Sequence, residues 1–104
     1  MKVIYNKIIP FKGYKCINLF GVLFVRKGCT MRESDYNHEA IHTKQMKELL
    51  YVSFYILYLL EWLCRLTQKG NAYRNISFEK EAYDNENDMD YLDKREHFSW
   101  IEYI

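Results

Sequence analysis

Cysteine, proline and glycine are all scarce in this chain of 104 residues, which contains three, one and four of them. The single proline and one glycine fall together at residues 10–13, and no stretch has the composition of a linker. Cys16, Cys29 and Cys64 are odd in number and lack CxxC spacing. This pattern favours free thiols in a reducing compartment and argues against a cysteine-based metal site.

A long hydrophobic run is also missing. The longest uncharged apolar stretch, residues 49–60, would span about 18 Å as a helix, short of the roughly 30 Å of a bilayer core. We therefore expect a core helix there, in preference to a membrane span or peripheral membrane contact. The apolar run 17–25 lacks a small-residue cleavage site and is predicted to be a buried strand. The expected location is cytoplasmic.

Acidic residues are absent from the first third of the chain. Residues 1–32 hold seven Lys or Arg and no Asp or Glu, which gives them a formal charge of +7. Residues 33–104 hold the other eight Lys or Arg and all fourteen Asp or Glu, so their formal charge is 8 − 14 = −6 and the whole chain has +1. A basic segment can attract anions. Because no recognised nucleic-acid motif accompanies it, we interpret it as a solvated hairpin and expect no nucleic-acid partner.

A metal-site motif is present in the segment His38-Glu39-Ala40-Ile41-His42. Positions four apart lie about 40° apart around a helix axis, so both imidazoles leave one face. There they can close on one Zn²⁺. Glu39 projects from a flank, where its carboxylate can hold and deprotonate a water molecule. The spacing predicts a zinc site with Glu39 as a general base.

The third ligand is predicted downstream, in Phe78-Glu79-Lys80-Glu81-Ala82-Tyr83. With this run, the chain resembles the gluzincin-type zincin metallopeptidases, in which a second helix supplies a glutamate ligand. The resemblance covers roughly residues 36–86 and assigns the ligand to Glu79, with Glu81 as the alternative. It departs at Tyr83, which stands where an aspartate commonly braces a zinc histidine. Asp84, Asn85 or another group is left to take that role.

The resemblance implies a minimal zinc-dependent peptidase or hydrolase acting on a peptide or protein substrate. The alternative is a zincin-like protein that binds zinc without significant turnover. Short length and Tyr83 favour this alternative, whereas the intact Glu39 favours catalysis, because a structural site needs no base.

The expected fold is a single α+β domain over residues 1–104 with a minimal zincin-like core. Strands are predicted at 2–5 and 15–25, joined by a turn at 10–13. The zinc-motif helix should run to about residue 50, capped by Ser34 or Asp35. An apolar scaffold helix is expected at 54–68, a glutamate-bearing helix capped by Ser77 follows, and a last helix is expected at 90–102.

Overall fold

The predicted α+β class is confirmed by the computed structural model, which describes residues 2–8 and 15–104. The turn expected at residues 10–13 lies outside the described residues. The elements, in chain order, are β1 (Lys2–Asn6), β2 (Cys16–Leu19), β3 (Val22–Arg26), α1 (Glu33–Glu48), α2 (Val52–Arg65), α3 (Ala72–Asn75), α4 (Ser77–Asn85), α5 (Tyr91–Lys94) and the 3-10 helix η1 (Ser99–Tyr103).

The sheet has the strand order β1-β3-β2, with β1 parallel and β2 antiparallel to β3. The single strand predicted at 15–25 is wrong, because a two-residue turn divides it. Phe20 and Gly21 both have positive φ, 54° and 87°, as a tight hairpin turn with the right twist requires. The glycine sits inside an apolar run, so its turn signal was hidden. As a result β2 becomes an edge strand of the described sheet.

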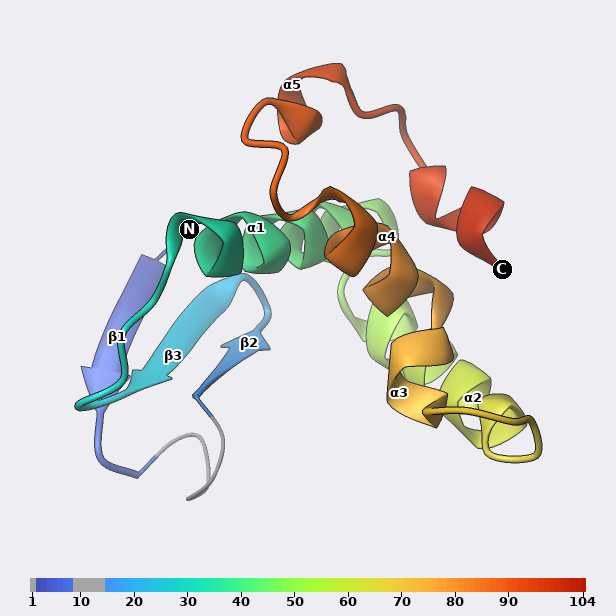
Figure 1. The fold of residues 1–104 in the computed structure, drawn as a ribbon, viewed down its shortest axis with the longest axis horizontal. Coiled ribbons are helices and arrows are strands. Elements are labelled where there is room, and N and C mark those ends of the chain that lie inside the picture. The colour runs from blue at the N-terminus through green and yellow to red at the C-terminus, as the bar shows by residue number, and fades with distance from the viewer. Residues whose placement is uncertain (1, 9–14) are drawn as a thin grey trace.

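Helix α1 crosses the middle of the molecule, with the sheet near its N-terminal end and α2 near its C-terminal end (Figure 1). Its buried face consists of Ile41, His42, Gln45 and Met46. The expected cap at Ser34 or Asp35 is wrong by two to three residues, because Arg32 is the N-cap. The Asp35 carboxylate instead accepts the Arg32 backbone N–H at 2.9 Å, the reciprocal half of a capping box.

The junction between α1 and α2 is a sharp, strained turn. The Leu50 N–H bonds to the Lys47 carbonyl and the Tyr51 N–H to the Met46 carbonyl, which is a Schellman arrangement. Leu50, with φ 56°, occupies the position that normally belongs to glycine. Tyr51 follows at φ 61°, ψ −64°, with the Val52 N–H bonded to the Leu50 carbonyl at 2.7 Å, as in a γ-turn of positive φ.

Helix α2 is not the central core helix that the sequence predicts. Within α2, all of which the structure describes, Phe54 alone is buried, and it packs with Met46, Ile76 and Phe78. A second inward contact comes from Glu61, whose carboxylate accepts the Ser77 backbone N–H at 2.7 and 2.9 Å. Ser77 was expected to be the N-cap of α4, but it is the first residue of this helix. The Glu61 carboxylate accepts the backbone N–H at the helix N-terminus in place of a cap side chain.

The helix predicted at 90–102 is also wrong, since α5 and η1 are separate. Between them Arg95 has an extended backbone, and its guanidinium lies buried between the carboxylates of Glu48 and Glu81. Phe98 has φ 59° and donates its backbone N–H to Glu48 at 2.7 Å. Burial alone would raise the pKa of Glu48, but these partners lower it below its ordinary 4.5. The buried ion pairs, which periodicity does not reveal, break the helix.

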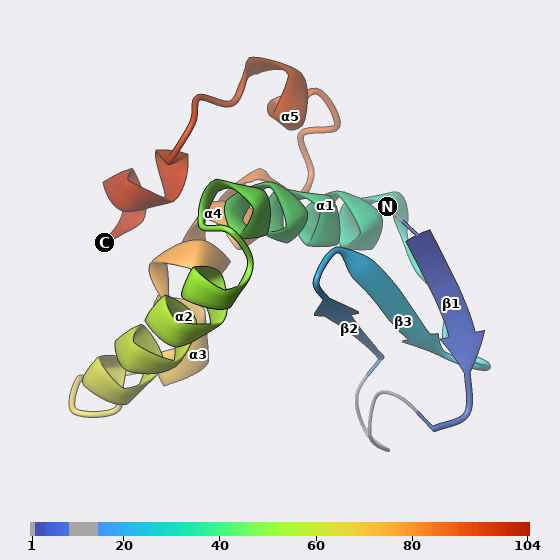
Figure 2. The same cartoon turned by 180° about the vertical axis from the view of Figure 1, so that it is seen from behind.

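Both views place the sheet and α2 on the same side of α1 but at opposite ends, with α5 across α1 from them (Figures 1 and 2). Asn18 fastens β2 to α1, because its side-chain amide donates to the Glu39 carbonyl and to Thr43 Oγ1, each at 3.0 Å. The metal motif on α1 therefore faces the region between β2 and α2.

Candidate metal centre

The three side chains that the sequence nominates as metal ligands lie together. His38 Nε2 and His42 Nε2 are 3.2 Å apart, and Glu79 Oε1 lies 3.1 Å from the first and 3.0 Å from the second. The two histidines come from successive turns of α1, and the glutamate from the first turn of α4. The group is almost enclosed, with side-chain exposures of 12%, 7% and 4%. It could hold a metal ion.

The triangle of ligand atoms has the size that zinc requires. Tetrahedral bonds of about 2.0–2.1 Å place two ligand atoms about 3.3–3.4 Å apart. The observed separations of 3.0–3.2 Å differ from that by a few tenths of an ångström. Two nitrogens and one carboxylate oxygen are also a donor set that zinc uses where a fourth position stays open. The residues therefore fit zinc by both geometry and chemistry.

The pKa values in the ligand group reflect one strong attraction, between Glu79 and His42. Burial works to lower the pKa of His42, but the Glu79 carboxylate outweighs it and raises this pKa to about 9. For Glu79, burial works to raise the pKa, and the two histidines with the Tyr58 hydroxyl hold it well below its usual range. Glu79 is thus ionised, as a metal ligand must be. Tyr58 donates to its second oxygen at 2.6 Å.

The outer nitrogen of each imidazole has its own partner. His42 Nδ1 lies 2.7 Å from Gln45 Oε1, and His38 Nδ1 lies 3.0 Å from Glu86 Oε1. Such contacts fix the tautomer that leaves Nε2 free for a metal, and a carboxylate partner raises ligand basicity. Glu86 thus takes the bracing role left open at Tyr83. Tyr83 itself contacts His38 through its ring, at a centroid distance of 4.5 Å.

Glu81, the alternative ligand, points away from the histidines. Its carboxylate is fully buried and bonds to Gln45 Nε2 at 2.9 Å, to Tyr91 OH at 2.6 Å and to the Arg95 guanidinium. Two residues correspond to about 200° around a helix axis, so Glu79 and Glu81 cannot face the same site. The register of α4 that brings Glu79 to the histidines gives Glu81 a structural role.

The candidate base, Glu39, lies beside the ligand group with part of its carboxylate unsatisfied. Its Oε2 atom is buried and has no hydrogen-bond partner among the residues that the structure describes. Burial raises the pKa of Glu39 above its ordinary 4.5, and the charges of His42 and His38 oppose that rise. A buried carboxylate oxygen without a partner is costly, so its position next to a ligand group points to a function.

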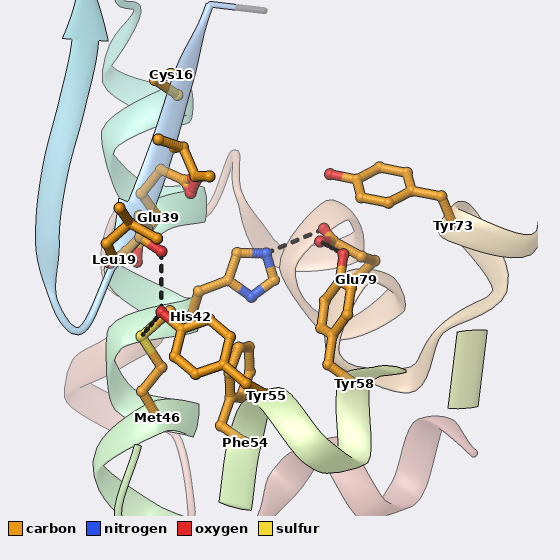
Figure 3. A pocket seen from close by; sticks show the side chains of 12 residues that line it. Cys16, Leu19, Glu39, His42, Met46, Phe54, Tyr55, Tyr58, Tyr73 and Glu79 are labelled. Carbon is orange, nitrogen blue, oxygen red and sulfur yellow. Dashed lines mark hydrogen bonds and ion pairs between the residues drawn. The ribbon is translucent and has the colours of Figure 1, made fainter. Parts of the chain in front are cut away.

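A cleft of about 720 Å³ opens over Glu39, His42 and Glu79. Strand β2 forms one wall with Cys16, Ile17, Asn18 and Leu19, and the opposite wall is aromatic, with Phe54, Tyr55, Tyr58 and Tyr73. Figure 3 shows the phenol of Tyr73 directed into the cleft across from Glu39, above Glu79. Burial and the Glu79 charge raise the pKa of Tyr73, so its hydroxyl stays protonated.

No family model, curated protein or solved structure matches this chain. The metal-binding interpretation therefore rests on the HExxH spacing and on the geometry of the three ligands. Four residues around them, Gln45, Tyr58, Tyr73 and Glu86, were not predicted. Only Gln45 had a signal in the sequence, because it is three residues from His42 on the same helix face. The others come from segments that only the tertiary fold brings to the site.

Proposed function

We propose that this protein is a zinc-dependent hydrolase that cleaves peptide bonds, with zinc held by His38, His42 and Glu79. The observation that supports it best is the buried, unpartnered oxygen of Glu39 beside this ligand group. A site that only stores metal needs ligands but no base. The general resemblance to gluzincins, taken from the motif residues, agrees with this assignment.

The chain's own residues supply the proton chemistry. Zinc, when bound, supplies a Lewis acid that activates water and polarises a carbonyl. Glu39 then accepts a proton from the attacking water on its unpartnered oxygen and returns it to the leaving amine. Its raised pKa suits the first step, because the carboxylate is a stronger base than that of an exposed glutamate.

Three residues keep the ligands in position during these steps. Gln45 and Glu86 orient the two imidazoles, and Tyr58 holds the second oxygen of Glu79. This leaves one carboxylate oxygen of Glu79 directed at the histidines. Tyr73, kept protonated, presents an O–H group within the cleft, where it can hydrogen-bond a carbonyl oxygen on which negative charge develops.

A peptide is the substrate that the cleft walls favour. One wall is the edge strand β2, and an extended peptide can pair through main-chain hydrogen bonds with the part of this edge outside the Asn18 carbonyl, which accepts from the Tyr55 hydroxyl at 3.1 Å. The opposite wall offers the rings of Phe54 and Tyr55, which suit an apolar side chain. Among the described residues that line the cleft, the charged ones are Glu39 and the ligands His42 and Glu79. A substrate with a charged side chain next to the scissile bond would find no ion-pair partner other than these, so such substrates are disfavoured.

The test is cleavage of a quenched-fluorescence peptide library by the zinc-loaded protein and by Glu39→Gln. The matched control is Glu33→Gln, an exposed glutamate in the first turn of the same helix. Glu39→Gln should keep its zinc and its fold but lose activity by at least about a thousandfold, because an amide cannot accept the water proton. Glu33→Gln should keep full activity.

Equal activity in wild type and Glu39→Gln would refute the proposed mechanism. Zinc binding of normal affinity with no cleavage by any of the three proteins would instead support the alternative, a metal-binding protein without turnover.

A further inference from the structure

Among the described elements, α2 carries the most exposed large apolar side chains, and they lie on its outward side. Six residues on one side of the helix are between 48% and 61% exposed, and together we call them the α2 face: Val52, Ile56, Leu59, Leu60, Leu63 and Leu66. Trp62 and Leu57 border this face, 37% and 38% exposed. Figure 2 shows α2 in front of α3, at the end of the molecule away from the sheet.

The α2 face is unusually broad. At 100° per residue, the exposed apolar positions from Trp62 round to Leu57 cover roughly 220° of the helix circumference. A single partner helix needs an apolar stripe only about 100° wide. One helix from a second copy would therefore leave half of this face in water. A medium that surrounds the outer half of the helix covers all of it.

No charge interrupts the α2 face among the described residues. The two charged residues of α2, Glu61 and Arg65, pair with each other on the inner side and are 17% and 16% exposed. Glu61 is committed to capping α4 through Ser77. The α2 face thus offers no ionic partner to a protein surface and no acidic group that would repel an anionic one.

A cation lies beyond one end of the face. Residues 66–76 contain two exposed cations, Lys69 and Arg74, and no acidic residue. Arg74 belongs to the cleft side of α2, because its guanidinium lies 3.6 Å from the ring centre of Tyr83, which in turn contacts His38. Lys69 is therefore the cation next to the face. An uncharged apolar face bordered by a tryptophan and flanked by a lysine suits a helix that lies in the headgroup region of an anionic bilayer.

The length of α2 sets its orientation. No helix among the described residues is long and apolar enough to cross a bilayer. A helix of 14 residues is about 21 Å long and can instead lie flat, with one side buried in the interface. At its N-terminal end, the exposed Leu50 and Phe20 extend the apolar surface to the tip of the β2–β3 hairpin, where Phe20 packs against Tyr55.

We propose that the α2 face docks on the surface of an anionic phospholipid membrane, with Lys69 against the headgroups. The inner side of the same helix carries Phe54 and Tyr58, which line the metal cleft. Docking therefore holds the cleft about one helix diameter, 10–12 Å, from the membrane surface. A peptide close to a membrane would then be within reach of the site.

Flotation with vesicles tests this proposal on the intact chain. Vesicles of phosphatidylcholine alone are compared with vesicles that also contain phosphatidylglycerol. The wild type should float with the anionic vesicles, and its tryptophan emission, to which Trp62 and Trp100 both contribute, should shift to the blue. The double variant Ile56→Glu, Leu63→Glu should bind at least about tenfold more weakly, because two charges would enter the apolar interface.

Two comparisons separate membrane docking from nonspecific hydrophobic adsorption. A matched double variant, Met89→Glu with Ile101→Glu, changes apolar residues of similar exposure, 48% and 52%, away from the α2 face. It should bind vesicles as the wild type does. Lys69→Gln should weaken binding to the anionic vesicles about fivefold and leave binding to neutral vesicles unchanged. Circular dichroism melts should match the wild type for all variants.

Absence of flotation with anionic vesicles would overturn the proposal, as would equal flotation of the wild type and the α2 double variant. Absence of flotation together with a dimer that this double variant dissociates would assign the α2 face to a second copy of the chain. Zinc content is measured on the same samples, so failure of membrane binding does not alter the conclusion about the metal centre.

Discussion

Replacing Gln45 with leucine should damage both the fold and the metal centre. Gln45 is fully buried and bonds to His42 Nδ1 at 2.7 Å, to the Phe78 carbonyl at 3.0 Å and to Glu81 at 2.9 Å. Leucine preserves the volume but makes none of these bonds. The His42 N–H then loses its partner in a buried site, which costs about 1–3 kcal/mol, and the other two bonds contribute about 1 kcal/mol each.

We therefore expect Gln45→Leu to lower the free energy of unfolding by about 3–5 kcal/mol in urea denaturation. Zinc affinity of the folded variant should fall about 10- to 100-fold, because the His42 ring loses the contact that fixes its tautomer. Lys44→Leu, at an exposed neighbouring position, is the control and should change stability by less than about 0.5 kcal/mol. A change in Gln45→Leu as small as the control's, with unaltered zinc affinity, would refute the reasoning.

Three further predictions concern other positions. Leu50→Gly should raise the free energy of unfolding by about 1 kcal/mol, because Leu50 is exposed and has positive φ; lower stability in urea would count against that turn. Glu48→Gln should lower stability by about 3 kcal/mol at pH 7, because it removes one of the two buried carboxylates that pair with Arg95. Because the folded-state pKa of Glu48 lies below 4.5, wild-type stability from this group is present above pH 4.5 and is lost as the pH falls from there through the folded-state pKa. Acid titration of the variant should lack that loss, and identical pH profiles would exclude the contribution. Glu86→Ala should weaken zinc binding about tenfold through His38, and unchanged affinity in a zinc titration would remove Glu86 from the site.

The sequence predicted the parts of the site that local spacing determines. His38, Glu39 and His42 lie within two turns of one helix, so helix geometry alone fixes their relation. Glu79 was chosen over Glu81 from a motif, and the register that separates them depends on Ser77, which Glu61 of a different helix caps. Contacts of this kind have no signature in the local sequence.

The errors have similar causes. The strand predicted at 15–25 failed because Gly21 forms a turn inside an apolar run, and the helix predicted at 90–102 failed because Arg95 is drawn into a buried ion pair. Helix α2 was expected in the core because its composition is apolar on nearly every side. A chain of this size has one small core, and its apolar residues exceed what that core can enclose.

The central claim is that His38 and His42 hold zinc together with Glu79. Isothermal titration of the metal-free protein with zinc tests it most directly, using His38→Ala, His42→Ala and His97→Ala, the third histidine being 91% exposed at the side chain. We predict one zinc per chain for the wild type and for His97→Ala, and loss of this binding in the other two variants. Unchanged stoichiometry and affinity in His38→Ala and His42→Ala would contradict the claim.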